Sequence, residues 1–216
     1  MRLLRQMLKG TQLARVAAVW LVCLLGLVSG MQPAAAEIRQ EAQEVESIKA
    51  EFIQKRYLKM LDEPLISKGV MYFKAPDSLR WEYTEPVKSV LLMQEENIQQ
   101  YVQADQEMVQ QEGQELETMR VLLQEICLWM QGEFEANPGL KVTGQSDDKV
   151  LLQPEQDQAL AGMLQEIEIR LGEQAGVIES VKVLEGPKSY TEIQFQDIKI
   201  NQDIDKEVFE SLEAGT

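Results

Sequence analysis

Hydrophobic residues change their spacing from helical to strand-like shortly after the first forty positions. The helical pattern starts at Glu37 and rests on apolar residues three or four positions apart: Ile38, Ala42, Val45 and Ile48. This spacing predicts an amphipathic helix. From Lys49 the period is two, with Phe52 on one face, so a β-strand is predicted to follow the helix directly.

Further runs with a period of two follow, separated by turn residues. Ser67–Lys74 is rich in strand-forming residues, and the turn Ala75–Ser78 leads into Leu79–Tyr83. In this run Leu79, Trp81 and Tyr83 share one face, whereas Arg80 and Glu82 lie on the other. Because adjacent runs are joined by short turns, the sequence predicts antiparallel strands with local pairing.

The middle of the chain predicts a weak hairpin and then a helix. The hairpin centres on Ile98–Val102 and Met108-Val109, within a segment rich in Gln and Glu. The helix is indicated by helical spacing at Met119, Leu122, Leu123, Ile126, Cys127 and Met130. More strands are predicted in the last third: Leu140–Thr143, Lys149–Gln153, Glu166–Leu171, Val177–Leu184 and Tyr190–Ile200.

The pattern therefore predicts one mainly β (α+β) domain over residues 37–216, with about nine to eleven antiparallel strands and two principal helices. Two helices, each about 10–12 Å in diameter, cannot densely fill the concave side of such a sheet. Either the sheet closes into a barrel, or an apolar cavity suited to an alkyl chain remains beneath the helices. Ordinary core packing is the third alternative that the pattern leaves open.

The first 36 residues have the features of a secretory signal peptide. Four basic residues and no acid precede the 13-residue apolar run Val16–Val28, and the small residues Ala34-Ala35-Ala36 form a cleavage site. A membrane anchor is the alternative, but the run is shorter than the about 20 residues that span a bilayer. We therefore expect cleavage after Ala36 and export of the remaining chain.

Composition disfavours several functional classes. The chain has 21 Lys and Arg against 36 Asp and Glu, and loss of the predicted signal peptide changes its net charge from −15 to −19. Such an acidic chain repels nucleic acid. It has no histidine, and its only cysteine after residue 36 is Cys127, so nucleophilic catalysis and metal binding lack their usual residues. We expect neither an enzyme nor a cofactor.

Three stretches resemble the LolA-like family of periplasmic carriers of outer-membrane lipoproteins. Ser47–Lys55 resembles the first strand of the family with its Phe-x-Gln signature, and Gly69–Tyr83 resembles its glycine-to-tryptophan hairpin, followed by Pro86 at the expected distance. The series Lys149–Phe209 is similar in spacing. The order of these motifs extends the resemblance over nearly the whole chain after the predicted signal peptide.

The resemblance implies an unclosed β-barrel, or strongly curved sheet, whose concave face is covered by a helical lid. The cavity would receive the acyl chains of a lipoprotein or related lipid, brought by an inner-membrane exporter complex and passed to an outer-membrane acceptor by a monomeric periplasmic carrier. The residues expected to line the cavity and lid are Phe52, Met71, Phe73, Leu79, Trp81, Tyr83, Met119, Leu122, Leu123, Ile126, Ile167 and Ile169.

Two features depart from the family pattern. General lipoprotein carriers of the family have an arginine before the hairpin proline that holds the lid closed, whereas Ala75 stands here. The lid is then either held in another way or more open at rest. The apolar stretch Tyr57–Leu65 is the second feature. It is interpreted as strand residues packed beneath the lid, in preference to an exposed tip that touches a membrane or partner.

Three other functions remain as alternatives. Paired acids such as Glu166 and Glu168 could serve acid–base catalysis, although acidic pairs are expected by chance in so acidic a chain. The same fold could instead sense lipid or lipoprotein and regulate a membrane partner. It could also carry a non-lipoprotein lipid for a dedicated exporter.

Overall fold

A computed structural model describes residues 45–95, 97–105, 107–112, 114–155, 159–162, 164–174 and 177–212, all within the unit formed by residues 41–216. For residues 114–119, 121, 122, 159 and 160 it describes the backbone alone. The predicted signal peptide, residues 1–36, and most of the helix predicted from Glu37 lie outside the described residues.

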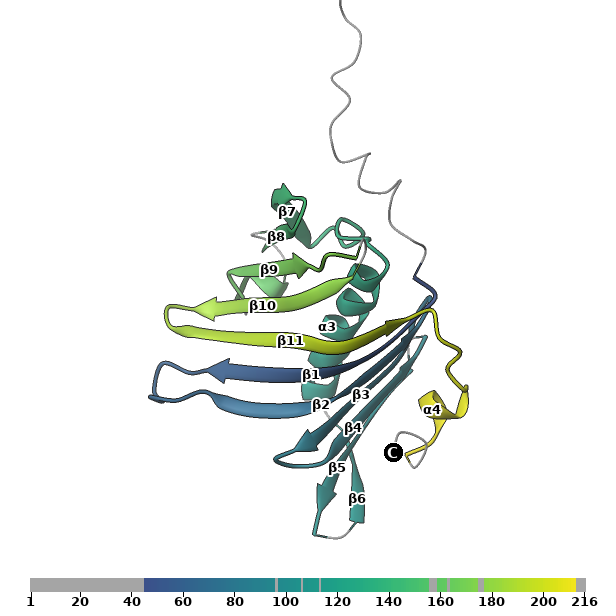
Figure 1. Cartoon of the computed structure of the whole chain (residues 1–216). Helices are drawn as coiled ribbons and strands as arrows, with labels where there is room; N and C mark the ends of the chain where they lie inside the picture. Colours follow the sequence, from purple (N-terminus) through teal and green to yellow (C-terminus); the bar gives the residue numbers. More distant parts are fainter. Residues whose placement is uncertain are drawn as a thin grey trace, which may run out of the picture. The chain divides into compact units, whose positions relative to one another are not determined.

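Eleven antiparallel strands form one continuous sheet (Figure 1). They are β1 (Ser47–Tyr57), β2 (Leu65–Lys74), β3 (Ser78–Glu85), β4 (Ser89–Gln94), β5 (Asn97–Ala104), β6 (Glu107–Gln111), β7 (Leu140–Ser146), β8 (Lys149–Pro154), β9 (Glu166–Leu171), β10 (Ile178–Gly186) and β11 (Ser189–Ile200). Their order is β6-β5-β4-β3-β2-β1-β11-β10-β9-β8-β7, so β6 and β7 are unjoined edges. The predicted class, an unclosed antiparallel sheet with a helical element, is confirmed.

Helices are few in the described part of the chain. The longest is α3 (Gln114–Met130), which connects the edge strands β6 and β7, and α4 (Glu207–Glu210) and the 3-10 turn η2 (Ala159–Gly162) are short. The sequence predicted this helix only from Met119, whereas α3 begins at Gln114. The residues before Met119 are rich in Gln and Glu, which favour a helix but form no apolar stripe that would reveal one. None of the described helices combines the length and the apolar character that crossing a membrane requires.

The strand register determines which side chains share a face, because directly opposed residues project to the same side of a sheet. Phe52 is opposite Phe195 on β11 and Gly69 on β2, and Gly69 is opposite Tyr83 on β3. Met71 is likewise opposite Trp81. One face of the sheet thus collects aromatic and aliphatic side chains from neighbouring strands, and these belong to one core cluster with residues of α3.

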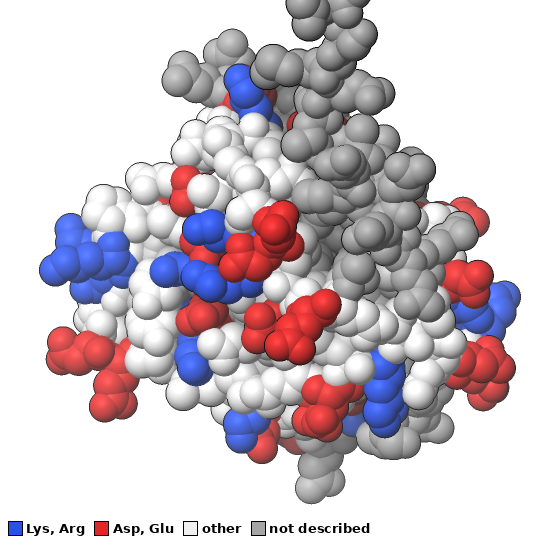
Figure 2. Space-filling view, turned by 45° about the horizontal axis from the view of Figure 1, so that its top comes forward, with Lys and Arg blue, Asp and Glu red and all other residues white. Residues whose placement is uncertain are grey.

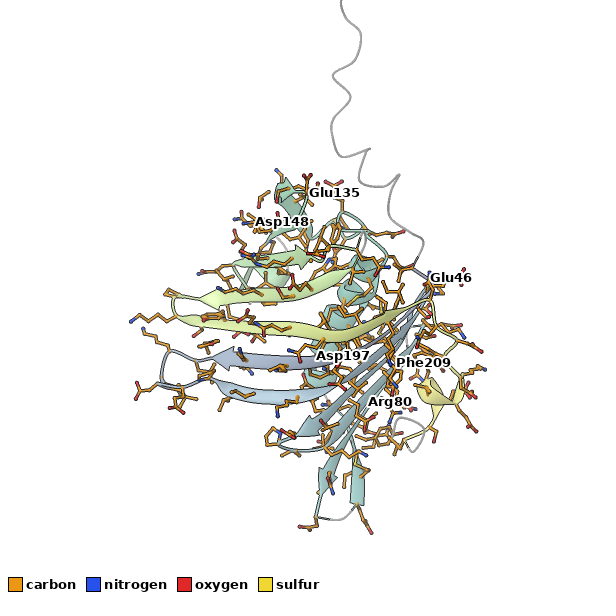
Figure 3. All side chains as sticks on the ribbon, viewed as in Figure 1. Glu46, Arg80, Glu135, Asp148, Asp197 and Phe209 are labelled. Carbon is orange, nitrogen blue, oxygen red and sulfur yellow. The ribbon has the colours of Figure 1, made fainter. Side chains whose placement is uncertain are left out.

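The opposite face is covered by the C-terminal segment. Ile204 and Phe209 form a second, smaller apolar cluster with Tyr72 of β2. Beside them lies Arg80 of β3, whose side chain is fully buried, and Figure 3 shows Arg80 and Phe209 close together where α4 meets the sheet. The predicted orientation of Arg80, away from the α3 side, is confirmed, but its burial was not predicted.

Arg80 has a complete set of polar partners. Its guanidinium forms an ion pair with Glu82 at 2.8 Å, and it donates hydrogen bonds to the backbone carbonyls of Val208, Ser211 and Leu212 at 3.1, 2.6 and 3.1 Å. Lys88 lies 3.4 Å from the second carboxylate oxygen of Glu82. A buried charge is tolerated only when it is paired and hydrogen-bonded, so this cluster fastens residues 208–212 to the sheet.

Gly69 creates the space that the Phe52 ring occupies. A Cβ at position 69 would collide with the Glu82 carbonyl oxygen and with the Phe52 ring. We therefore expect Gly69→Ala to lower the free energy of unfolding by about 1–3 kcal/mol, the usual cost of overpacking, in equilibrium urea denaturation. Gly186→Ala is the matched control, because a Cβ there meets no atom within 4 Å. Equal losses in the two variants would contradict this role of Gly69.

Candidate functional site

The structure brings most of the predicted lining residues into one apolar interior between the sheet and α3. Eight of them are buried members of the main core cluster: Phe52, Met71, Phe73, Leu79, Trp81, Leu123, Ile167 and Ile169. Tyr83 and Ile126 are partly buried and pack against the cluster. Met119 and Leu122 lie in α3, but their side chains are outside the described part of the structure. Whether these residues line a ligand site remains a prediction.

Four aromatic rings form the centre of this interior. The Phe52 ring lies 4.4 Å from the Trp81 ring and 5.3 Å from the Tyr83 ring, the latter edge to face. Phe195, which was not predicted as a lining residue, approaches Trp81 edge to face at 6.1 Å. Such pairs add about 0.5–1.5 kcal/mol each beyond the burial of their area. Strands β1, β3 and β11 therefore hold a stable aromatic wall.

Polar atoms at this wall are few and incompletely paired. The Tyr83 hydroxyl donates to Gln54 Oε1 at 2.9 Å, and burial raises the pKa of Tyr83, so the phenol stays neutral. The Trp81 indole N–H influences that pKa but does not reach hydrogen-bonding geometry. Within the described residues, the buried indole N–H groups of Trp81 and Trp129 have no hydrogen-bond partner. Each such buried donor costs about 1–3 kcal/mol.

Helix α3 supplies the other wall of the interior. Leu123, Cys127, Trp129 and Met130 are buried in the core cluster. Burial raises the pKa of the Cys127 thiol to about 12, so the thiol is unreactive at neutral pH. Burial also raises the pKa of Glu125, whose carboxylate accepts a hydrogen bond from the Asn137 side chain. The helix therefore contributes mainly apolar side chains to the core, and it also carries one acid that burial biases toward its neutral form.

The described space next to Met130, at the end of α3, is narrow in this conformation. A crevice lies between the sheet and the end of α3, but it is too narrow to admit a water molecule. It is lined by Ile48, Ala50, Met71, Met130, Val177, Ile178, Phe195 and Ile198. Of the alternatives that the sequence left open, the described conformation thus shows a packed core at this crevice, and an alkyl chain can enter here only if the residues that line it move apart.

A wider hollow of about 500 Å³ lies on the other face of the sheet. It is bounded by β1, β2, β11 and the segment from Gln202 to Val208, and charged residues such as Lys49, Glu51 and Asp197 line it. Figure 3 places Asp197 on β11. Because burying hydrocarbon next to ionised groups strips their hydration, this hollow does not suit an acyl chain.

A side chain just beyond α3 connects the helix to the β2–β3 turn. The Gln131 side-chain amide donates a hydrogen bond to the Pro76 carbonyl at 2.9 Å and another to the Cys127 carbonyl at 3.0 Å. Pro76 directly follows Ala75, the position where the resemblance implies an arginine. The polar connection between helix and turn therefore comes from the helix side in this chain.

The β1–β2 loop contradicts the preferred interpretation of Tyr57–Leu65. Instead of packing beneath α3, Met60 is 87% exposed, Leu61 44% and Leu65 52%. The prediction was wrong because the loop, residues 58–64, extends beyond the last paired residues of β1 and β2. The alternative interpretation, an exposed apolar tip, describes the structure.

The described side chains include no gathering of three or more acidic or cysteine residues that could hold a metal ion. The acids considered for catalysis, Glu166 and Glu168, are opposite Leu184 and Lys182 in the sheet. Glu168 forms an ion pair with Arg170 at 3.0 Å, and Glu166 accepts a hydrogen bond from the Gln153 side chain at 3.0 Å. These partners are those of ordinary surface acids.

Comparison with known proteins identifies a family. The sequence profile described as "Outer membrane lipoprotein carrier protein LolA" matches residues 43–211. A comparison with curated protein sequences gave no significant match.

Several solved structures are similar to this chain at low sequence identity. A DUF1329 family protein from Desulfovibrio piger is 11% identical with a TM-score of 0.45, and the match covers 81% of this chain and 93% of that one. A LolA superfamily protein from Nitrosomonas europaea is 10% identical with a TM-score of 0.40, over 81% and 94%. The Pseudomonas aeruginosa MucA/MucB complex matches at 13% identity and 0.37, over 82% and 59%. Matches this distant support no conclusion about function.

Proposed function

Because the chain belongs to the LolA family of outer membrane lipoprotein carrier proteins, we propose that it is a periplasmic carrier of lipoprotein acyl chains. The chains occupy the apolar interior between the sheet and α3, and the protein takes them from an inner-membrane exporter complex to an outer-membrane acceptor. The observation that carries the proposal is the continuous apolar interior, which in the described part of the chain is walled on one side by α3.

The interior offers acyl chains a replacement for the contacts of α3. Leu123, Trp129 and Met130 pack against the strands in the described conformation. If α3 moves away, a bound chain restores the burial that these side chains gave up, at about 0.8 kcal/mol for each buried methylene. Exchange of one apolar cover for another keeps the sheet protected from water, and the helix therefore acts as a lid.

The unpaired indole groups favour an acylated ligand over a plain hydrocarbon. Trp81 and Trp129 each bury an N–H donor without an acceptor among the described residues. A lipoprotein anchor carries ester and amide carbonyl oxygens beside its alkyl chains, and these are the acceptors that the two donors lack. Binding of such a ligand would satisfy buried donors and bury alkyl chains in the same interior.

The Gln131 connection regulates how readily the lid opens. A single hydrogen bond of this kind contributes about 0.5–1.5 kcal/mol net, so Gln131→Ala is expected to raise the open population up to about tenfold. Hydrogen–deuterium exchange should become faster in α3, with unchanged protection in β1, β2 and β11. Gln103→Ala, at an exposed position of β5, is the control. Unchanged exchange in α3 of Gln131→Ala would show that this bond does not hold the lid.

Delivery between membranes tests the proposal. The exported protein is mixed with donor vesicles that contain a fluorescent triacylated peptide and with unlabelled acceptor vesicles, and the label is followed over time. A carrier accelerates appearance of the label in the acceptor vesicles. Extraction of the peptide without delivery would contradict a carrier and favour a sensor of the same fold, and absence of extraction would contradict both.

A further inference from the structure

Exposed apolar residues gather at one end of the sheet. Six large hydrophobic side chains are exposed among the described residues, and four of them belong to the β1–β2 hairpin: Met60, Leu61, Leu65 and Ile66. Their exposed fractions run from 44% to 87%. Exposed large side chains that gather at one site usually mark a surface of interaction. We call residues 57–66 the hairpin tip.

The hairpin tip is held in place by the neighbouring β10–β11 hairpin. The rings of Tyr57 and Tyr190 stack with their centres 4.3 Å apart, and the Arg56 guanidinium lies 3.6 Å from the Glu185 carboxylate. The Lys59 backbone N–H also donates to Ser189 Oγ at 3.3 Å. These contacts present the apolar loop at a defined position, where Figure 1 shows both hairpins at the same end of the sheet.

The charge of this region differs from that of the chain as a whole. Residues 55–68 contain four basic and two acidic residues, in a chain of net charge −15. Two of the basic side chains are paired outside the segment, Arg56 with Glu185 and Lys68 with Glu85 at 3.0 Å. The four basic residues are balanced by the two acidic residues of the segment together with these two glutamates, so the sum of the charges is zero. Figure 2 shows basic and acidic atoms together at the left edge, where Figure 1 places the two loops.

The composition of the hairpin tip matches the interfacial region of a lipid bilayer. Apolar side chains enter the boundary between headgroups and acyl chains, tyrosine rings prefer the headgroup level, and lysine side chains reach the phosphates. The tip combines Met60 and Leu61 with the stacked Tyr57 and with Lys59. The tip itself also carries Asp62 and Glu63, but residues 55–68 and their two paired glutamates sum to zero, so an anionic bilayer repels this region less than the acidic remainder of the chain.

From these observations we propose that the hairpin tip inserts into the surface of a phospholipid bilayer and docks the protein there. Strands β1 and β2 lead from the tip to Phe52, which lies four residues before Arg56 on the same face of β1, where Arg56 and Leu65 are the last paired residues of the two strands. Docking therefore brings the end of the apolar interior toward the bilayer from which chains leave or which they enter. The role of docking in acyl-chain transfer rests on the proposed function, whereas the exposure and position of the hairpin tip do not depend on it.

A fluorescent label at the tip tests insertion directly. Met60→Cys is labelled with an environment-sensitive dye, while Cys127 stays unlabelled because its thiol is buried and its pKa is about 12. With vesicles of phosphatidylethanolamine and phosphatidylglycerol (3:1), the dye emission should shift to the blue and persist in 0.5 M salt. Val109→Cys, a 43% exposed position on β6, is the matched control and should show no shift.

Substitution of the apolar residues measures their contribution. We expect Met60→Ser combined with Leu61→Ser to reduce partition into the same vesicles about tenfold or more. The reason is that the serine side chains lack the apolar surface whose removal from water favours insertion. Both positions are exposed, so the fold is not affected. Equal partition of this variant and of the unsubstituted protein would overturn the proposal, as would an absent dye shift at position 60 or equal shifts at positions 60 and 109.

Two further outcomes separate docking from carriage and from protein recognition. Binding of a soluble acylated peptide is measured on the same samples, and the double variant should retain it in full. Vesicle docking without acyl binding would contradict the proposed function and leave the docking surface standing. A dye shift that requires membrane proteins in the vesicles would overturn docking to lipid and identify a protein partner instead.

Discussion

Arg80→Ala is expected to lower the free energy of unfolding by about 3–5 kcal/mol, the usual cost of breaking a buried ion pair from one side. The substitution leaves Glu82 buried, with Lys88 as its remaining basic neighbour among the described residues, and removes the donors for three carbonyls of residues 208–212. Equilibrium urea denaturation measures the loss. Hydrogen–deuterium exchange should also show that the C-terminal segment detaches from β3.

The control for this prediction is an arginine in an exposed ion pair. Arg170 forms an ion pair with Glu168 at the same sequence separation as Arg80 and Glu82, but its side chain is 54% exposed. Exposed pairs contribute at most about 1 kcal/mol, so Arg170→Ala should change stability little. Similar losses in the two variants would show that burial of Arg80 does not fasten the C-terminal segment.

Leu123→Glu is expected to weaken binding of an acylated peptide about a hundredfold. Leu123 is 3% exposed and faces the apolar interior from α3. A carboxylate there must either be neutralised or reach water, and its burial without a partner costs several kcal/mol. Both outcomes work against an acyl chain in the same space. Fluorescence titration with a labelled triacylated peptide measures the affinity.

The neighbouring position supplies a matched variant. Gln124 is half-buried and accepts a hydrogen bond from Arg120 at 3.4 Å. Gln124→Glu adds the same charge to the same helix, next to a basic residue, and should leave the affinity unchanged. Protected amides in β1 and β11 of both variants would show that the sheet is folded. Equal affinity of Leu123→Glu and Gln124→Glu would contradict the placement of the ligand beneath α3.

The sheet could be predicted from sequence because period-two alternation is strong where one strand face is buried. The alternation of Leu79, Trp81 and Tyr83 gave the correct face for each residue. The burial of Arg80 on the opposite face of the sheet leaves no comparable alternation in the sequence. Besides Glu82, the partners of Arg80 are backbone carbonyls more than 120 residues away, and backbone groups carry no information in the sequence.

The interior illustrates a different limit of prediction. Residues that line a cavity and residues that fill a core are of the same types, so the sequence placed Met71, Phe73 and Ile169 on the correct side but could not show whether space remained there. Phe195, Trp129 and Met130 also belong to the core cluster and lie within predicted elements, although they were not among the predicted lining residues. Gln131 was missed because one amide is inconspicuous in a chain so rich in glutamine.

Native mass spectrometry of the exported protein tests whether acyl chains occupy the interior most directly. The account predicts a species heavier than the bare chain by the mass of one acylated ligand, formed on export or after incubation with a triacylated peptide. It also predicts that this species is lost in Leu123→Glu and kept in Gln124→Glu. If the unsubstituted protein is found only as the bare chain, even after incubation with the peptide, the interior is a closed core and the protein is not a carrier of acyl chains.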